Sequence, residues 1–433
     1  MKSCSIPYDL MIEIFSRLPK KSVARFHCLS KLWGSTFNRP DFTKLFLTRS
    51  SARSRLLFVV KQQESTVQEG KKWNFYSSPQ RQNPYEKSSS SLVAVADFHR
   101  EFPPGKMTIM STSVRSFSCG YDSGLIYLHA MYFANSDFFS VICNPKTGQY
   151  ANLPYLRRYR KADSFFGFDP IDKQFKVLFM AYSSGPGHHK IMTLGSEEMR
   201  WRTIKCSLRH AIVSQGVCIN GVLYYLGEDE MDEKFVIVCF DVRYEKFKFI
   251  YLEGFCRLIN YKGKLGVVYW EDKNVRWKDK ADGNAIGLRV WVLEDSEKQE
   301  WSKYAYTLWD DNFFLDDGSY VSVAVVGVTA KGEIVLSMTH YTCKQPFYVF
   351  YFNPERNTLQ SVEVKGFGAN NEGFEKRRVY TFVNHVEDLN INDAKLLKQI
   401  SNCEPLKTYE EQDWEAQWPS ESESEEDRDE NWS

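Results

Sequence analysis

The strongest constraint on the fold is a pair of short motifs that recurs along the chain. The first motif is a glycine followed at once by apolar residues, which is typical of a tight turn that opens a β-strand. The second is an apolar strand that ends in Asn or Asp, whose side chain can bond backbone amides two residues further on. The second motif follows the first by about 20 residues at three places: Gly124 with Asn144, Gly221 with Asp241, and Gly332 with Asn353.

Residues 115–385 contain short runs of β-branched and aromatic residues separated by Gly, Pro, Asn and Asp, and no helical pattern of 12 residues interrupts them. Many short strands at regular spacing indicate a sandwich, a barrel or a propeller. The repeats favour a propeller, because two hairpins make one four-stranded blade. About 20 to 24 strands would give five to seven blades, and we favour six. An irregular large sandwich remains the alternative.

The first fifty residues show a different pattern, because their apolar residues recur at helical spacing. Pro19 ends the first expected helix, Ser22 and Ser30 are placed to cap the next two, and Asp41–Leu47 forms a fourth. The expected fold class is therefore α+β and multidomain. A small all-helical module over residues 1–50 precedes an all-β, propeller-like domain over residues 55–390.

The stretch Ile6–Trp33 reads IPYDLMIEIFSRLPKKSVARFHCLSKLW. It resembles the plant F-box, whose pattern is roughly LPxDLxxEILxRLPxKSLxRFRxVSKxW, and the likeness extends to Phe42. It departs from the pattern at Ile6, where the family has Leu, and at His27, where a basic residue is usual. Both changes are small, so the resemblance is dense over this part of the chain.

The remainder resembles the type 3 F-box-associated domain of plants, a kelch-like family. Three segments carry most of this likeness: Val141–Gln149, Phe166–Asp169 and Val379–Glu387. The family implies a propeller, which agrees with the interpretation of the repeats. Residues 391–433 lie outside the resemblance, and their acidic composition predicts a disordered tail.

The resemblance implies a substrate-recruiting subunit of an SCF-type ubiquitin ligase. The F-box would dock on a Skp-type adaptor, and through it on a cullin, while the second domain would bind a protein substrate. By position in the motif, the residues that would face the adaptor are Ile6, Pro7, Leu10, Ile14, Leu18, Val23, Phe26, Leu29 and Trp33. Leu10 and Trp33 are the candidate anchors. Alternatively, these side chains only hold the helices together.

Composition and motifs argue against other functions. The net charge of +1 does not favour nucleic acid or a membrane as a partner, and the longest apolar runs have strand length. The ten cysteines form no CxxC pair, so we expect reduced thiols and a nuclear or cytoplasmic protein. No catalytic motif, cofactor fingerprint or metal-ligand spacing appears, and we interpret His188-His189 as part of a solvated loop.

Two other functions stay open. An F-box scaffold or ligand sensor could act outside the ligase, and a propeller enzyme could carry an appended docking module. The substrate itself is not readable, since loops vary freely on a fixed scaffold. We expect it to contact the insert Glu271–Gly287 or the loop Tyr182–Lys190.

Overall fold

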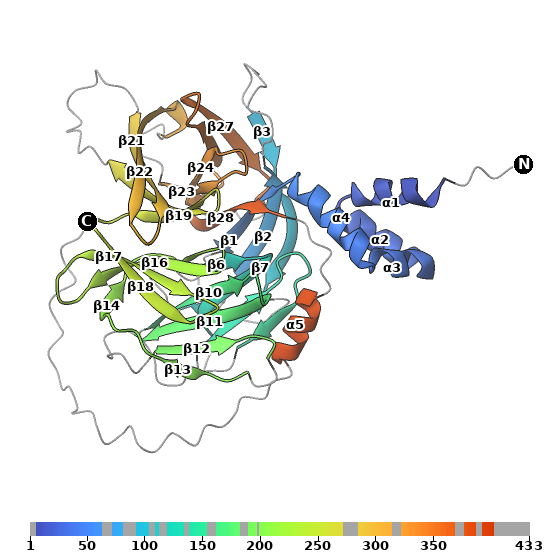
Figure 1. Cartoon of the computed structure of the whole chain (residues 1–433). Coiled ribbons are helices and arrows are strands. Elements are labelled where there is room, and N and C mark those ends of the chain that lie inside the picture. The colour runs from blue at the N-terminus through green and yellow to red at the C-terminus, as the bar shows by residue number, and fades with distance from the viewer. Residues whose placement is uncertain are drawn as a thin grey trace, which may run out of the picture.

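The computed structural model shows a helical N-terminal module joined to a β-propeller (Figure 1). It describes residues 6–62, 72–80, 92–103, 109–111, 119–133, 138–153, 162–181, 189–196, 199–271, 285–313, 322–368, 376–386 and 392–401 of the chain. The helices project from the side of the propeller next to β1 and β3, and α4 leads directly into β1.

The N-terminal module consists of four helices: α1 (Tyr8–Ser16), α2 (Lys20–Leu29), α3 (Lys31–Phe37) and α4 (Pro40–Ser51). Prolines delimit three of them. Pro7 and Pro19 are the N-caps of α1 and α2, and Pro40 is the first residue of α4. Proline suits the start of a helix because its missing N–H would have no partner there.

Serine capping was expected at Ser5, Ser22 and Ser30; Ser5 lies outside the described residues, and the other two positions differ in outcome. The Ser30 hydroxyl oxygen accepts a hydrogen bond from the N–H of Leu32 at 3.2 Å and so begins α3, as predicted. The cap predicted at Ser22 is wrong, because α2 begins two residues earlier and places Ser22 inside the helix.

Twenty-eight strands in the described part of the chain form six sheets, which are the six blades of the propeller. Blade 1 contains β1 (Arg55–Gln62), β2 (Lys72–Pro79), β4 (Asp97–Phe102), β25 (His340–Tyr341) and β28 (Arg377–His385). Blade 2 contains β5 (Ile109–Ser111), β6 (Cys119–Asp122), β7 (Leu125–Phe133), β8 (Phe138–Cys143) and β9 (Tyr150–Asn152). Blade 3 contains β10 (Ala162–Asp169), β11 (Gln174–Ala181), β12 (His189–Thr193) and β13 (Arg202–Ile204).

The remaining three blades follow in chain order. Blade 4 contains β14 (His210–Ile212), β15 (Val217–Ile219), β16 (Val222–Asp229), β17 (Phe235–Asp241) and β18 (Lys246–Leu252). Blade 5 contains β19 (Arg257–Tyr261), β20 (Lys264–Glu271), β21 (Ala285–Asp295) and β22 (Glu300–Trp309), and is followed by the short helix η1 (Asp311–Phe313). Blade 6 contains β23 (Val323–Val328), β24 (Ile334–Met338), β26 (Tyr348–Asn353), β27 (Thr358–Lys365) and β3 (Leu92–Val95).

The ring is closed by pairing between the two ends of the domain. β1 lies between β2 and β28 and pairs antiparallel with both, so that Val59 stands opposite Phe75 on one side and Tyr380 on the other. β3 adds a second link, because it pairs in parallel with β27 of blade 6. The six-bladed propeller confirms the interpretation of the repeats and excludes the sandwich.

The two repeated motifs form the turns that were expected of them. Gly124, Gly221 and Gly332 of the first motif, and Gly263 just before β20, all have φ between +84° and +92°, a region that disfavours side chains. In the second motif, the Asp241 carboxylate accepts hydrogen bonds from the N–H of Arg243 (3.0 Å) and of Tyr244 (2.7 Å). The same turn occurs at Asn144 and Asn353 of the second motif, and also at Asp169 and Asp295.

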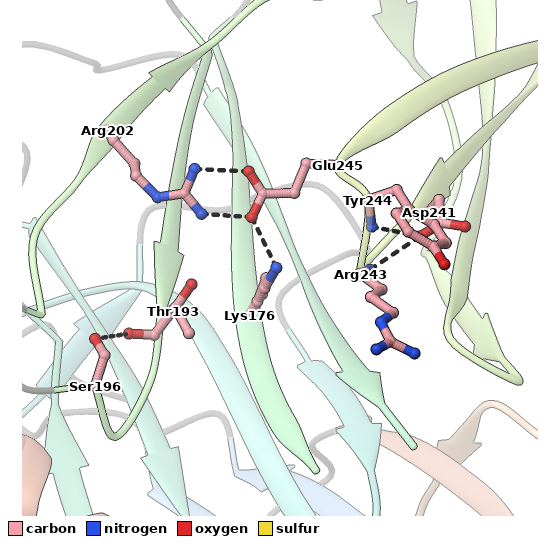
Figure 2. A network of polar contacts seen from close by, with 8 residues as sticks. All are labelled: Lys176, Thr193, Ser196, Arg202, Asp241, Arg243, Tyr244 and Glu245. Atoms are coloured by element: carbon pink, nitrogen blue, oxygen red, sulfur yellow. Dashed lines mark hydrogen bonds and ion pairs between the residues drawn. The ribbon is translucent and has the colours of Figure 1, made fainter. Parts of the chain in front are cut away.

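Neighbouring blades are joined by apolar packing and, between blades 3 and 4, by a partly buried ionic network. The rings of Phe165 in blade 3 and Tyr225 in blade 4 stack with their centroids 4.2 Å apart. Figure 2 shows Glu245, on the β17–β18 turn of blade 4, between Lys176 of β11 and Arg202 of β13. The Lys176 ammonium lies 2.7 Å from the carboxylate.

Residues after 390 were expected to be a disordered tail, and the structure corrects this at its start. Asn392–Ser401 forms helix α5, with Leu397 and Ile400 only 2% and 1% exposed. They pack into the core cluster that also holds Ala151 of β9 and Met192 of β12. The acidic residues from 402 onward lie outside the described residues.

A cavity of about 720 Å³ lies between the inner strands of five blades, β6, β15, β19, β23 and β28. We identify it as the axial channel of the propeller, since the inner strands of five of the six blades form its wall. None of the described helices is long and apolar enough to cross a membrane. The described residues contain no cluster of three or more His, Cys, Asp or Glu that could hold a metal ion.

Candidate protein-docking site

The helical module has a small core made almost entirely of aromatic rings. Its buried residues are Phe15, Val23, Phe37, Phe42 and Phe46. The Phe15 ring makes edge-to-face contacts with Phe26 and Phe37, at centroid distances of 4.9 and 5.1 Å. Aromatic residues let such a short chain segment bury a large apolar area.

Outside this core, several large apolar side chains stay in contact with solvent. Ile6, Leu10 and Ile14 recur at i, i+4 and i+8 and are 52%, 56% and 49% exposed. Leu29 and Leu32, on either side of the α2–α3 junction, are 74% and 60% exposed. These fractions apply to the whole chain, so the propeller does not cover the surface. We call these five side chains the apolar face of the module.

The residues predicted to face the adaptor fall into three groups. Ile6, Pro7, Leu10, Ile14 and Leu29 are exposed. Leu18, Phe26 and Trp33 are half-buried and pack against the aromatic core. Val23 is buried.

The prediction for Val23 is contradicted by its position. Its side chain is only 1% exposed and lies within the core cluster that includes Phe42 and Phe46 of α4. A partner could reach it only after the helices separate. Val23 therefore stabilises the module and is not part of its surface.

Trp33, one of the two candidate anchors, is held largely by its own module. The centroid of its ring lies 4.7 Å from that of Phe15, in an edge-to-face contact. The ring also stacks on that of Phe37, with the centroids 5.8 Å apart. Leu10, the other candidate, has no such role, because more than half of its surface is exposed. Of the two candidates, Leu10 therefore presents the larger free apolar surface.

Leu32 belongs to the apolar face but is missing from the predicted set. The signal for it was present, since the Ser30 cap fixes the start of α3 and thereby the direction in which Leu32 points. Leu47, on α4, is 40% exposed and was also not predicted. Neither position could be separated from core leucines by hydrophobicity alone.

Charged side chains hold α1 against α4 behind the apolar face. The Glu13 carboxylate accepts hydrogen bonds from Arg17 and from Arg49 of α4, each at 2.6 Å. The hydrogen bond from Arg17 and the charge of Arg49 lower the pKa of Glu13, so it remains ionised near neutral pH. The hydroxyl groups of Tyr8 and Thr36 lie 3.1 Å apart and link α1 to α3. These contacts fix the direction in which the exposed stripe of α1 faces.

On the propeller, the two loops expected to contact a substrate lie almost wholly outside the described residues. Only their ends can be placed, in β20, β21 and β12. The interpretation of His189 as part of a solvated loop is wrong, because it begins β12 and is 7% exposed. His188 lies outside the described residues.

The chain matches the family model of the F-box domain over residues 3–45 and that of the F-box associated beta propeller domain over residues 55–386. The F-box protein At2g15640 of Arabidopsis thaliana is 56% identical over 427 residues, covering 92% of this chain and 97% of the relative. F-box protein At1g47340 of the same plant is 54% identical over 414 residues, covering 92% and 86%. F-box protein At2g16450 is 52% identical over 426 residues, covering 92% and 97%.

Proposed function

Because this chain belongs to the plant F-box proteins that carry an F-box associated beta propeller domain, we propose that it recruits substrates to an SCF-type ubiquitin ligase. In this role helices α1–α3 bind a Skp-type adaptor, and through it a cullin. The propeller binds the protein that is to be ubiquitinated. The protein itself is a non-catalytic receptor and works in the nucleus or the cytoplasm.

The observation that carries the docking half of this proposal is the apolar face. Taken together, the exposed fractions of its five side chains equal about three fully exposed apolar side chains. Burying this area against a partner would contribute about 4–9 kcal/mol. The module leaves this surface uncovered although it already has a closed aromatic core, which is typical of an interface with a partner.

The arrangement of the two domains supports the receptor half. The propeller is closed by its own end strands, so it does not need the helices to complete a sheet. The helices stand away from it (Figure 1) and leave its surface available to a second protein. One end of the chain can thus bind the adaptor while the other binds cargo.

The proposal is tested by measuring the affinity of the full chain for a purified plant Skp-type adaptor. Leu10→Asp places a carboxylate on the exposed stripe of α1, between Ile6 and Ile14 of the apolar face. We expect it to weaken binding more than a hundredfold, because it removes apolar burial and leaves an unpaired charge in the interface. Ile171→Asp is the matched control, since Ile171 is 68% exposed on the β10–β11 turn of the propeller.

The two variants should unfold at the same denaturant concentration as the wild type, because both positions are exposed. Equal adaptor affinity of Leu10→Asp and Ile171→Asp would refute docking through this face. An adaptor that does not bind the wild-type chain would refute the proposed function as a whole.

A further inference from the structure

Two arginines line the axial channel of the propeller. Arg257 is the first residue of β19 in blade 5, and Arg378 is the second residue of β28 in blade 1. Both side chains belong to the wall of the same 720 Å³ cavity. Nothing in the proposed recruitment of a substrate to the ligase requires them.

The two arginines lie at the same end of the channel. At the opposite end, Asn384 after β28 donates a hydrogen bond to the carbonyl oxygen of Val328 at the end of β23, at 2.8 Å. Asn220, just after β15, likewise donates to the carbonyl oxygen of Gly263 just after β19, at 2.9 Å. The side chain of Lys262, just after β19, approaches Gly332, just after β23, so β19, β23 and β28 end on one side of the channel and their first residues lie toward the other. We call the end where they begin the basic mouth.

Neither guanidinium group is neutralised by the described part of the chain. No described carboxylate forms an ion pair with Arg257 or Arg378, and the buried Nε of Arg378 has no hydrogen-bond partner. The Arg378 guanidinium lies over the ring of Tyr380, 5.5 Å from its centroid, which holds it in place without satisfying its donors. Buried donors without acceptors are rare in native proteins, and each requires an explanation.

The electrostatics of the basic mouth agree with two uncompensated cations. Burial, together with the charge of Arg378, lowers the pKa of Arg257. Burial and the charges of Lys376 and Arg378 lower the pKa of His340 to about 4, so this imidazole is neutral at physiological pH. Asp122, which also lines the channel, ends β6 and therefore lies toward the other end.

We propose that the basic mouth is a binding site for a phosphate monoester, held between Arg257 and Arg378. A phosphate monoester carries close to two negative charges at neutral pH, which matches two guanidinium groups. Each guanidinium presents a planar fork of donors that fits phosphate oxygens in pairs. A monocarboxylate would neutralise only one of them.

The cavity also has a suitable size and lining for such a ligand. Its volume of about 720 Å³ lies within the usual range for small-molecule sites, roughly 300–1,000 Å³. Phe255, two residues before Arg257, is 60% exposed and lines the same cavity. It offers an apolar surface to the organic part of the ester. This site would give the receptor either a small-molecule ligand or a means of recognising a phosphorylated side chain of its substrate.

The test is calorimetric titration of the full chain at about pH 7.5, where phosphate monoesters are dianions. Phenyl phosphate serves as the free ester, a phosphoserine peptide as the protein-borne ester, and benzoate as the monoanion of matched shape. Arg257→Gln and Arg378→Gln each remove one guanidinium. Arg243→Gln, on the β17–β18 turn outside the cavity, is the control with the same change in charge.

We expect the wild type to bind at least one of the two esters more tightly than benzoate. Arg257→Gln and Arg378→Gln should each weaken that binding about tenfold to a hundredfold, the usual contribution of a charged hydrogen bond. Arg243→Gln should leave it unchanged. The tighter of the two esters identifies the source of the ligand.

A second measurement separates ligand binding from a structural role. Because Arg257 has no hydrogen-bond or ion-pair partner among the described residues, Arg257→Gln should not lower the thermal midpoint of the ligand-free protein. A lower midpoint, an ester affinity that both glutamine variants retain, or equal binding of benzoate would each overturn the site. Adaptor affinity should be the same in all these variants, so failure of this site is distinguishable from failure of the proposed function.

Discussion

Replacing Glu245 by glutamine should destabilise the propeller in a pH-dependent way. The carboxylate bridges blades 3 and 4 by accepting from Lys176 and Arg202 (Figure 2). The Lys176 side chain is only 9% exposed and that of Glu245 19%. In the variant, the Lys176 ammonium would stay buried without a carboxylate.

The size of the effect follows from this burial. Breaking a fully buried pair by removing one partner costs about 3–5 kcal/mol. Arg202 is 46% exposed and can turn to water, and glutamine keeps one acceptor oxygen. We therefore expect a loss of about 2 kcal/mol in the free energy of unfolding near pH 7.

The sign of the pH dependence is fixed by the pKa of Glu245. Burial alone would raise this pKa, but the hydrogen bonds from Arg202 and Lys176 outweigh burial and lower it below the usual value. A carboxyl group with a lowered pKa in the folded state contributes stability above its unfolded pKa, near 4.3. That contribution is lost as the pH falls through the folded pKa. The difference in the free energy of unfolding between the wild type and Glu245→Gln should therefore have its full value at pH 7 and should become smaller below about pH 4.5.

The assay is urea unfolding of both proteins as a function of pH. Glu297→Gln is the matched control, because Glu297 pairs with Lys248 across the next blade junction, with both side chains more than 60% exposed. A pair exposed to this degree contributes about 0–1 kcal/mol. A Glu245→Gln variant no less stable than Glu297→Gln at pH 7, or a difference independent of pH, would refute the reasoning.

Three further changes test other parts of the fold. Ser30→Ala removes the cap of α3 and should cost about 1 kcal/mol in unfolding of the helical module, and an unchanged denaturation midpoint would contradict the cap. Val23→Ala should cost about 2 kcal/mol through loss of buried methyl groups, yet the folded fraction should bind the adaptor as the wild type does; a direct loss of affinity would return Val23 to the interface. Leu397→Asp should release α5 and reduce hydrogen-exchange protection over residues 392–401 about a hundredfold, whereas the exposed Lys398→Asp should not; equal protection in both would mean that α5 does not need its buried face.

The fold could be predicted because local chemistry repeats along the chain. A glycine at positive φ and an Asn or Asp that binds backbone amides are required by every hairpin of this kind, so Gly221 and Asp241 identify the turns without tertiary information. Counting the strands between such turns predicted five to seven blades, of which we favoured the six that the structure has. Closure by β28 against β1 could not be seen in any local pattern, since it depends on residues from the two ends of the domain.

The docking site could be predicted only in part, because the apolar residues of one helix can face either the core of the module or its surface. The spacing placed Leu10 and Ile14 on one stripe of α1, and the structure leaves both exposed. In α2, Val23 and Leu29 are equally apolar, but packing against α4 buries the first and leaves the second outside. Which of the two lies inside is decided by the aromatic residues of another helix.

Two features were missed, each for a different reason. The acidic residues that follow Ser401 dominated the interpretation of residues 391–433, although Leu396, Leu397 and Ile400 have helical spacing. Arg257 and Arg378 are 121 positions apart in the sequence, and only closure of the ring brings them to one mouth of the channel. Neither arginine is unusual in its local context.

The most direct test of the central claim is affinity purification of the full chain from plant cells under proteasome inhibition, with identification of the co-purifying proteins. The wild type should carry a Skp-type adaptor, a cullin and at least one ubiquitinated protein. Leu10→Asp should lose adaptor and cullin while retaining that same protein in unmodified form, because the propeller is unchanged. If Leu10→Asp still carried the adaptor, or if the wild type carried neither adaptor nor cullin, the account of this protein as a ligase receptor would be contradicted.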